Sequence, residues 1–417
     1  MITELSLLKG ISRETNSKIV LVVIDGLGGL RHPEFLHKTE LQYANLPNLD
    51  KFVRDDDTVT GLIYPVRRGL IPGSVGGHLG LFGFDPLEFR VGRGAIEAEA
   101  LIGMAGVEIG DEDILARLNF CTVDSEGVIV DRRAGRIQSS EEYAKILNEN
   151  ITEVLGTKIR VIATKEHRGV LVIENRNGRL NWNVHDTDPE FPGYKPMSAV
   201  PIMEDEASAR TAGIVNEFCK HAREVLKPHY PVNCVILRGF SSRLSVRSLP
   251  RFPEYYKLNA CAIAAYPLYR GLARLVGMTV LPIATHLEHQ VELLKEVFEK
   301  YDFFFFHYKD PDSRGEDGNF LGKVEALERF DRVFPEIVAL GSDVIAVTGD
   351  HSTPSIMKKH TEHSVPLAIR SRYMKGFDRS NAFDEDTCNQ GTFGRIEGPA
   401  LMKTLLAKAG KLAKWDG

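Results

Sequence analysis

The chain has 417 residues, of which 43% are apolar and 26% are charged, and its formal net charge is -5. This balance is typical of a folded globular protein and excludes a disordered or fibrous chain. The length is sufficient for two domains, and the slight acidic excess argues against a nucleic-acid-binding surface.

Cysteine spacing and hydropathy indicate the compartment. The five cysteines are scattered and form no CxxC pair, which argues against a zinc cluster or a disulfide framework and favours a reducing cytoplasm. Residues 1–18 mix acidic and basic side chains, unlike a signal peptide, and no run of about 18 apolar residues predicts a membrane span. We therefore expect a cytoplasmic protein, and the sequence leaves its oligomeric state open.

The first predicted element is a strand over Lys18–Ile24, a continuous β-branched run that ends in Asp25 and a glycine-rich turn. Such a run is typical of a buried parallel strand with a functional loop at its carboxyl end. The Asp25 carboxylate can therefore face a cation or a phosphate, although an Asp-Gly pair after a strand is also common as a helix N-cap.

Ser74 lies in the segment PGSVGGH, where a helix is expected to begin. Free backbone N–H groups at a helix start attract an anion and favour a developing alkoxide. A serine that only caps the helix is the structural alternative.

The middle of the chain, residues 107–252, reads as an inserted α+β domain. It contains short strands such as Val170–Glu174, turn-rich segments, and one helix around Ala207–Val225. Because strands of the first type occur on both sides of it, we predict a core domain of residues 1–106 and 253–417, with the insertion acting as a substrate-binding lid.

The C-terminal third alternates strands and helices. Strands are predicted at Phe303–Phe306 and Asp343–Thr348, and amphipathic helices at Leu287–Lys300 and Lys323–Leu340. This alternation predicts an α/β fold with a doubly wound, mostly parallel sheet, which binds ligands at the carboxyl ends of its strands.

Acidic and imidazole side chains follow these strands. Asp350 and His351 come after the last strand, Asp312 and Glu316 follow the strand at 303–306, and His360 lies nine residues after His351. Together with Asp25 and Ser74, they can hold two divalent ions at the spacing used for in-line phosphoryl transfer. The sequence therefore predicts a two-metal phosphoryl-transfer site with Ser74 as nucleophile.

Longer motifs extend over nearly the whole chain. They include IDGLGG at Ile24–Gly29, PGSVGGHLGLFGFDP at Pro72–Pro86, DRRAGRI at Asp131–Ile137, LYRGLARLVGM at Leu268–Met278 and TGDHSTP at Thr348–Pro354. In these motifs the chain resembles the archaeal-type cofactor-independent phosphoglycerate mutases of the alkaline phosphatase superfamily, and it looks closest to their bacterial branch.

The resemblance implies an alkaline phosphatase-like core and a cytoplasmic isomerase of glycolysis and gluconeogenesis. Such an enzyme interconverts 3-phosphoglycerate and 2-phosphoglycerate through a phosphoserine, without 2,3-bisphosphoglycerate and without a nucleic-acid or membrane partner. It also implies two divalent ions, often manganese, with magnesium, cobalt or zinc as alternatives.

Carried over by motif, one ion is held by Asp25, Ser74, Asp350 and His351, and the other by Asp312, Glu316 and His360. Glu316 stands where many family members have histidine, which makes the second site richer in oxygen ligands. Arg270 stands where a lysine is common near the serine, and we expect it to hold phosphate as a catalytic residue.

Arg132, Arg133 and Arg136 of the inserted region are candidates for binding the substrate carboxylate and phosphate, because planar guanidinium groups match both anions. Arg93 and Arg168 are further candidates of the same kind. Two other functions stay open: a phosphatase or another phosphomutase of the superfamily, because the motifs do not specify the acceptor, and a metal-binding homologue with weak activity.

Overall fold

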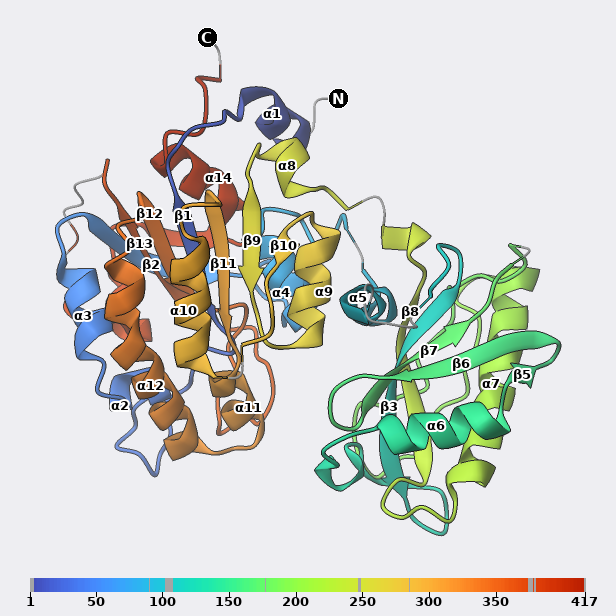
Figure 1. The fold of residues 1–417 in the computed structure, drawn as a ribbon. Coiled ribbons are helices and arrows are strands. Elements are labelled where there is room, and N and C mark those ends of the chain that lie inside the picture. Colours follow the sequence, from blue (N-terminus) through green and yellow to red (C-terminus); the bar gives the residue numbers. More distant parts are fainter. Residues whose placement is uncertain are drawn as a thin grey trace. The chain divides into compact units, whose positions relative to one another are not determined.

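The computed structural model describes residues 4–89, 91–101, 108–176, 178–246, 249–284, 286–373, 378 and 380–415. The chain forms two compact units (Figure 1). The first unit comprises Met1–Phe89 and Pro250–Gly417, and the second comprises Arg90–Leu249.

An eight-stranded sheet, mostly parallel, forms the middle of the first unit. Its order is β10-β9-β11-β1-β12-β13-β2-β14, and only β13 runs antiparallel to its two neighbours. The strands are β1 (Ile19–Ile24), β2 (Thr58–Tyr64), β9 (Ala260–Ile263), β10 (Thr279–Val280), β11 (Phe303–Tyr308), β12 (Val344–Thr348), β13 (Val365–Ser371) and β14 (Gly394–Glu397). The predicted α/β class with a mostly parallel sheet is confirmed.

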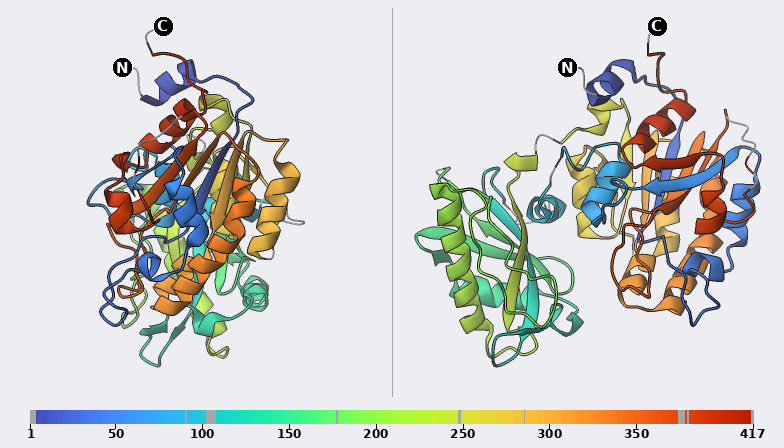
Figure 2. Two further views of the ribbon diagram at one scale, coloured as in Figure 1. Left: turned by 90° about the vertical axis from the view of Figure 1, so that its left-hand side faces the viewer. Right: turned by 180° about the vertical axis from the view of Figure 1, so that it is seen from behind.

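Helices cover both faces of this sheet (Figures 1 and 2). Helices α10 (Leu287–Val297) and α12 (Phe320–Val338) lie on one face, and α4 (Ser74–Leu81) and α14 (Ala400–Lys408) on the other. Every residue of β1 is therefore buried, which explains why its sequence is apolar without alternation. The remaining helices are α1 (Glu4–Ile11), α2 (Glu40–Tyr43), α3 (Pro47–Arg54), α8 (Phe252–Tyr255), α9 (Pro267–Leu275), α11 (Asp310–Glu316) and α13 (Glu385–Asn389).

The three strands that precede the predicted site residues are adjacent. β1 lies between β11 and β12 and runs parallel to both, in the register Val22 to Phe306 and Val22 to Val347. Because parallel strands end at the same edge of a sheet, the loops after β1, β11 and β12 meet there.

The second unit is built on an antiparallel sheet. Its long strand β3 pairs antiparallel with β4, β7 and β8, and β6 and β5 continue from β7. The strands are β3 (Ile114–Val123), β4 (Ile129–Asp131), β5 (Glu153–Val154), β6 (Thr157–Ala163), β7 (Arg168–Ile173) and β8 (Cys234–Ser241). The helices are α5 (Arg93–Leu101), α6 (Glu141–Asn150) and α7 (Glu206–Leu226), with short 3-10 turns at Ala134–Arg136 and Leu244–Val246.

An apolar core on one face of this sheet packs under α6 and α7 and includes Leu118, Phe120 and Phe218. Helix α5 packs on β3 and β8 of the same unit. The second unit therefore begins at Arg90, whereas the sequence analysis assigned residues 1–106 to the core domain. None of the described helices has the length and apolar character to cross a bilayer.

Candidate metal and phosphoryl-transfer site

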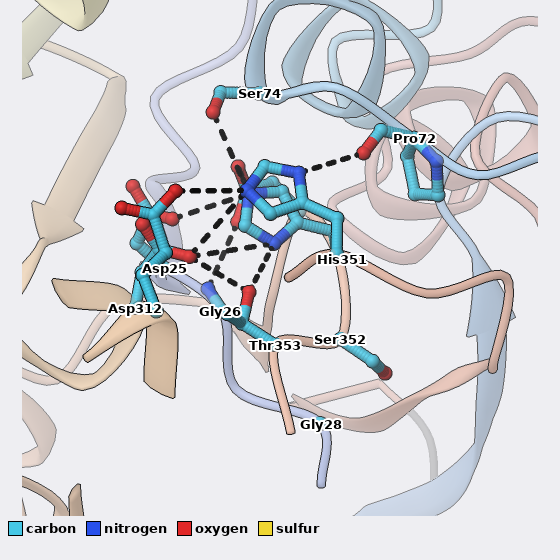
Figure 3. A network of polar contacts seen from close by, with 12 residues as sticks. Asp25, Gly26, Gly28, Pro72, Ser74, Asp312, His351, Ser352 and Thr353 are labelled. Atoms are coloured by element: carbon cyan, nitrogen blue, oxygen red, sulfur yellow. Dashed lines mark hydrogen bonds and ion pairs between the residues drawn. The ribbon is translucent and has the colours of Figure 1, made fainter. Parts of the chain in front are cut away.

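Three loops of the first unit bring the predicted site residues together (Figure 3). Asp25 directly follows β1, Asp312 lies in α11 just after β11, and Asp350 and His351 follow β12. All four side chains are buried. Asp25 is followed by a turn, so its carboxylate faces the cluster and does not cap a helix. At Gly26, whose φ is +65°, a Cβ would lie 2.7 Å from the Asp312 backbone.

Ser74 approaches the cluster from the first turn of α4. Gly73 is the N-cap residue, so the buried Ser74 hydroxyl is not used as a cap, and its Oγ lies 3.5 Å from His351 Nε2. One turn later, His78 Nδ1 donates to the Ser74 carbonyl over 2.7 Å and lies 3.2 Å from Asp350 Oδ2. A Cβ on Gly77 would lie 2.1 Å from the Asp350 carbonyl oxygen, so glycine permits this close approach of helix and loop.

Asp25, Asp350 and His351 form one group whose ligand atoms lie within 4.8 Å of one another. His351 Nε2 is 3.4 Å from Asp25 Oδ1 and 3.1 Å from Asp350 Oδ2. Among the described residues, neither of these two carboxylate oxygens has a hydrogen-bond donor. Buried acceptors without donors are rare, and a cation would satisfy both.

A second group consists of Asp312, His351 and His360. His360 Nε2 lies 3.6 Å from Asp312 Oδ1 and 3.9 Å from Glu316 Oε1. The imidazoles of His351 and His360 stack with their centroids 3.6 Å apart. His351 therefore belongs to both groups, whereas the sequence assigned it to one.

The hydrogen bonds of the two imidazoles determine which nitrogen can bind a cation. Thr353 Oγ1 donates to Asp312 Oδ1 over 2.7 Å, so it can only accept from His351 Nδ1, which lies 2.9 Å away. His360 Nδ1 donates to the carbonyl of Pro72 over 2.9 Å. With Nδ1 protonated on both rings, each Nε2 offers its lone pair to a cation when the ring is neutral.

Lys309 brings a positive charge into this cluster. Its Nζ donates to Asp312 Oδ2 over 2.5 Å, to Asp25 Oδ2 over 3.1 Å and to the Tyr269 hydroxyl over 3.0 Å. Burial disfavours the ammonium, but the carboxylates of Asp25 and Asp312 outweigh it and raise the pKa of Lys309 well above its usual value.

The same balance acts on His351. Burial opposes its charged form, yet Asp350, Asp312 and Asp25 raise its pKa to about 9 in the metal-free protein. For Asp350, burial is again the opposing effect, and His351 and His78 lower its pKa well below the usual value. Positive charge around Asp312 and Asp350 thus lowers the pKa of both carboxyl groups and keeps them ionised.

These residues fit a pair of divalent ions. Carboxylate oxygens and imidazole nitrogens are the ligands of manganese, zinc, cobalt and magnesium sites. The structure meets three requirements of such a site. The two ligand groups share the His351 imidazole, Asp25 Oδ1 and Asp350 Oδ2 are buried without hydrogen-bond donors among the described residues, and the Nε2 atoms of His351 and His360 face the carboxylates.

Sequence reasoning missed five residues of this site. Lys309, Tyr269, His78, His307 and Thr353 all contact the predicted ligands or each other. His307 Nε2 lies 3.0 Å from Asp25 Oδ2, and its ring stacks on Tyr269 at 3.7 Å. All but His307 lie within four residues of a predicted site residue, which is the signal that could have identified them.

Arg270 lies on α9, next to Tyr269. Its Nη1 donates to the backbone carbonyls of Ala264, over 3.0 Å, and Leu281, over 2.8 Å. These bonds fix the guanidinium against the loops around β9 and β10, and a role in phosphate binding stays a prediction.

The predicted arginines of the second unit surround a buried part of its sheet. Arg117 lies opposite Arg238 in the pairing of β3 with β8, and Arg168 lies opposite Asn119 in the pairing with β7. Burial lowers the pKa of Arg117 to about 9; Glu97 opposes this effect, and Arg168, Arg93 and Arg238 add to it. These positive charges are therefore close together.

Arg133 and Arg136 belong to the same basic region. Burial, followed by the charges of Arg168, Arg117, Arg133 and Arg136, lowers the pKa of His167 to about 3. Arg132 instead forms a two-point contact with Asp188, over 3.2 Å and 2.5 Å. Sequence reasoning missed Arg117 and Arg238, although an arginine in the apolar run ILARLNF was a signal.

Comparison with known proteins gives consistent matches. A sequence model of the 2,3-bisphosphoglycerate-independent phosphoglycerate mutase family matches residues 56–233. A protein of Thermus thermophilus named "probable 2,3-bisphosphoglycerate-independent phosphoglycerate mutase" is 45% identical over 413 residues, which cover 98% of each chain. A protein of the same name from Thermotoga maritima is 44% identical over 405 residues, covering 96% of each.

Solved structures agree with these matches. A protein from Pyrococcus horikoshii superposes with a TM-score of 0.77 at 27% identity, covering 96% of this chain and 99% of its own. The cofactor-independent phosphoglycerate mutase from Thermoplasma acidophilum gives a TM-score of 0.60 at 28% identity, with coverages of 94% and 100%.

Proposed function

The chain belongs to the 2,3-bisphosphoglycerate-independent phosphoglycerate mutases, a family of isomerases, and from that membership we propose that it interconverts 3-phosphoglycerate and 2-phosphoglycerate through a phosphoserine on Ser74. The observation that supports this most strongly is the position of the Ser74 hydroxyl, buried at the start of α4 and 3.5 Å from the imidazole shared by two ligand groups.

We assign the proposed ligands as follows. Asp25, Ser74, Asp350 and His351 would hold one divalent ion, and Asp312, Glu316 and His360 the other, with His351 close to both. When bound, the ions would neutralise charge on the phosphoryl oxygens and lower the pKa of the serine hydroxyl. Manganese is the proposed ion, with magnesium, cobalt and zinc as alternatives, and no 2,3-bisphosphoglycerate is required.

The residues of the chain then divide the work of transfer. Ser74 Oγ forms a bond to phosphorus as the bond from phosphorus to the 3-oxygen of glycerate breaks. The 2-oxygen of the same glycerate next attacks the phosphoserine and releases Ser74. Backbone N–H groups in the first turn of α4 favour the phosphoryl charge, and the bond from His78 to the Ser74 carbonyl keeps this turn in place.

The arginines of the second unit are proposed to bind the carboxylate and phosphate of the substrate. Arg93, Arg133, Arg136 and Arg168 are near the buried Arg117 or His167, and their combined charge favours a small anion. Asp188 holds Arg132 in a fixed orientation from which a remaining N–H group can donate. This region would retain the glycerate while the phosphoryl group is on Ser74.

An enolase-coupled assay tests the proposal. Chelator-treated protein should regain formation of 2-phosphoglycerate when manganese, magnesium, cobalt or zinc is added, and the order of the metals identifies the preferred ion. Ser74→Ala should abolish turnover. Ser342→Ala is the matched control, because the buried Ser342 hydroxyl has no hydrogen-bond partner among the described residues. Release of inorganic phosphate without 2-phosphoglycerate would instead indicate a phosphatase.

A further inference from the structure

A fully buried lysine, Lys323, contacts the loops that carry the proposed metal ligands but is not itself one of the ligands. Lys323 is 0% exposed and lies in the first turn of α12. Its Nζ donates to the backbone carbonyls of Gly28 and Thr353, each over 2.9 Å. A buried ammonium is costly to desolvate, so its position calls for a structural or functional reason.

The two carbonyls belong to two different ligand-bearing loops. Gly28 lies in the loop that begins with Asp25, and Thr353 lies in the loop that begins with Asp350 and His351. The Gly28 carbonyl also accepts from the Thr353 N–H over 3.1 Å. Lys323 therefore fastens the loop after β1 to the loop after β12 at the point where they already touch.

Thr353 connects the hydrogen bonds of Lys323 to the proposed metal ligands. Its carbonyl accepts from Lys323, while its hydroxyl bonds both Asp312 and His351. A shift of Thr353 would therefore displace contacts in both ligand groups.

Two acids, the buried Glu40 and the half-buried Glu385, support the same loops. Glu40 accepts from the Ser355 N–H over 2.8 Å, and Glu385 accepts from the Gly29 N–H over 2.8 Å. Burial lowers the pKa of the Lys323 ammonium, and Glu40, Glu385 and Asp312 act against this effect. Hydrogen bonds from Lys323, Glu40 and Glu385 thus stabilise the loops after β1 and β12.

We propose that Lys323 is a positioning residue, a tethered internal cation that holds Asp25, Asp350, His351 and Asp312 at the separation that two divalent ions require. The proposal rests on the two-metal site of the proposed function. It assigns to Lys323 an effect on metal affinity that is transmitted through backbone carbonyls.

The experiment measures Mn²⁺ binding to the chelator-treated full chain by calorimetry, with the enolase-coupled assay in parallel. Lys323→Met keeps the length of the side chain and removes the ammonium. We expect Mn²⁺ affinity to fall about ten- to hundred-fold, as for other groups that orient metal ligands, and kcat to fall more than KM changes.

Lys411→Met is the matched control. Lys411 is also 0% exposed and donates to the Thr15 carbonyl over 2.8 Å, but its other contact is Asp302, at the opposite end of β11. It should lower thermal stability and leave Mn²⁺ affinity unchanged. Equal Mn²⁺ affinity in Lys323→Met and the wild type would overturn the proposal, as would an equal loss in both lysine variants.

Lys323→Ala provides a second route if the methionine variant does not fold. This variant has space for a small amine, so methylammonium chloride should restore Mn²⁺ affinity, while sodium chloride at equal ionic strength should not. Restoration by neither salt would refute the tethered-cation role. A wild-type protein that binds Mn²⁺ but forms no 2-phosphoglycerate would count against the proposed function and leave the role of Lys323 intact.

Discussion

Thr353→Val tests the link between the two ligand groups. The substitution keeps the size of the side chain and removes the hydroxyl that lies 2.7 Å from Asp312 Oδ1 and 2.9 Å from His351 Nδ1. Both partners are buried, so each would lose a bond that water cannot easily replace. A hydrogen bond to a charged group contributes about 1.5–3 kcal/mol. Losing one such contribution from the metal-bound state corresponds to a decrease of about ten- to hundred-fold in metal affinity.

Mn²⁺ calorimetry on the variant measures this decrease directly. Thr361→Val is the control, because the buried Thr361 Oγ1 has no hydrogen-bond partner among the described residues, and this change should leave Mn²⁺ affinity unaltered. Thr353→Ser keeps the hydroxyl and should bind Mn²⁺ within a few-fold of the wild type. A Thr353→Val protein with wild-type affinity would show that the hydroxyl does not orient the ligands, and the assignment of the His351 tautomer would be wrong.

Two further predictions concern the metal-free protein. Lys309→Met removes the cation between Asp25 and Asp312 and should destabilise the chelator-treated protein by about 3–5 kcal/mol in urea unfolding, a deficit that Mn²⁺ should reduce. Lys295→Met, which breaks an exposed pair, should cost at most about 1 kcal/mol, and an equal cost for both would contradict the prediction. His351 has a pKa of about 9 when folded and about 6.5 when unfolded, so the stability that its charge contributes is complete below pH 6.5 and lost as the pH rises through 9. The melting temperature of the chelator-treated wild type should therefore exceed that of His351→Gln most at about pH 6, and a difference that is constant to about pH 9.5 would contradict this.

The three central strands β1, β11 and β12 and the helices α10 and α12 of the first unit could be predicted from hydropathy. The strand predicted at Lys18–Ile24 is observed at Ile19–Ile24, and the helix predicted at Leu287–Lys300 is observed at Leu287–Val297. Their signals are strong because helices cover both faces of a parallel sheet, so burial determines the sequence of each strand. Convergence of the loops followed from the same topology, since Asp25, Asp312 and Asp350 all lie just beyond parallel strands.

Contacts that depend on three-dimensional packing could not be predicted in this way. Lys323 looked like an ordinary polar residue at the start of an amphipathic helix, yet it is buried and bonded to two loops that are distant in the sequence. Lys309 lies three residues before Asp312 in the sequence, but its contact with Asp25 could not be predicted, because only the pairing of β11 with β1 brings the two together. Hydrophobic periodicity predicts which side chains are buried in a core, but it does not predict the hydrogen-bond partners of a polar side chain.

Acid-quenched mass spectrometry of the manganese-loaded protein tests the central claim most directly. After brief incubation with 3-phosphoglycerate, the peptide that contains Ser74 should carry one phosphoryl group, and Ser342→Ala should give the same result. A phosphoryl group on another residue, or none on Ser74 while 2-phosphoglycerate is being formed, would contradict transfer through this serine.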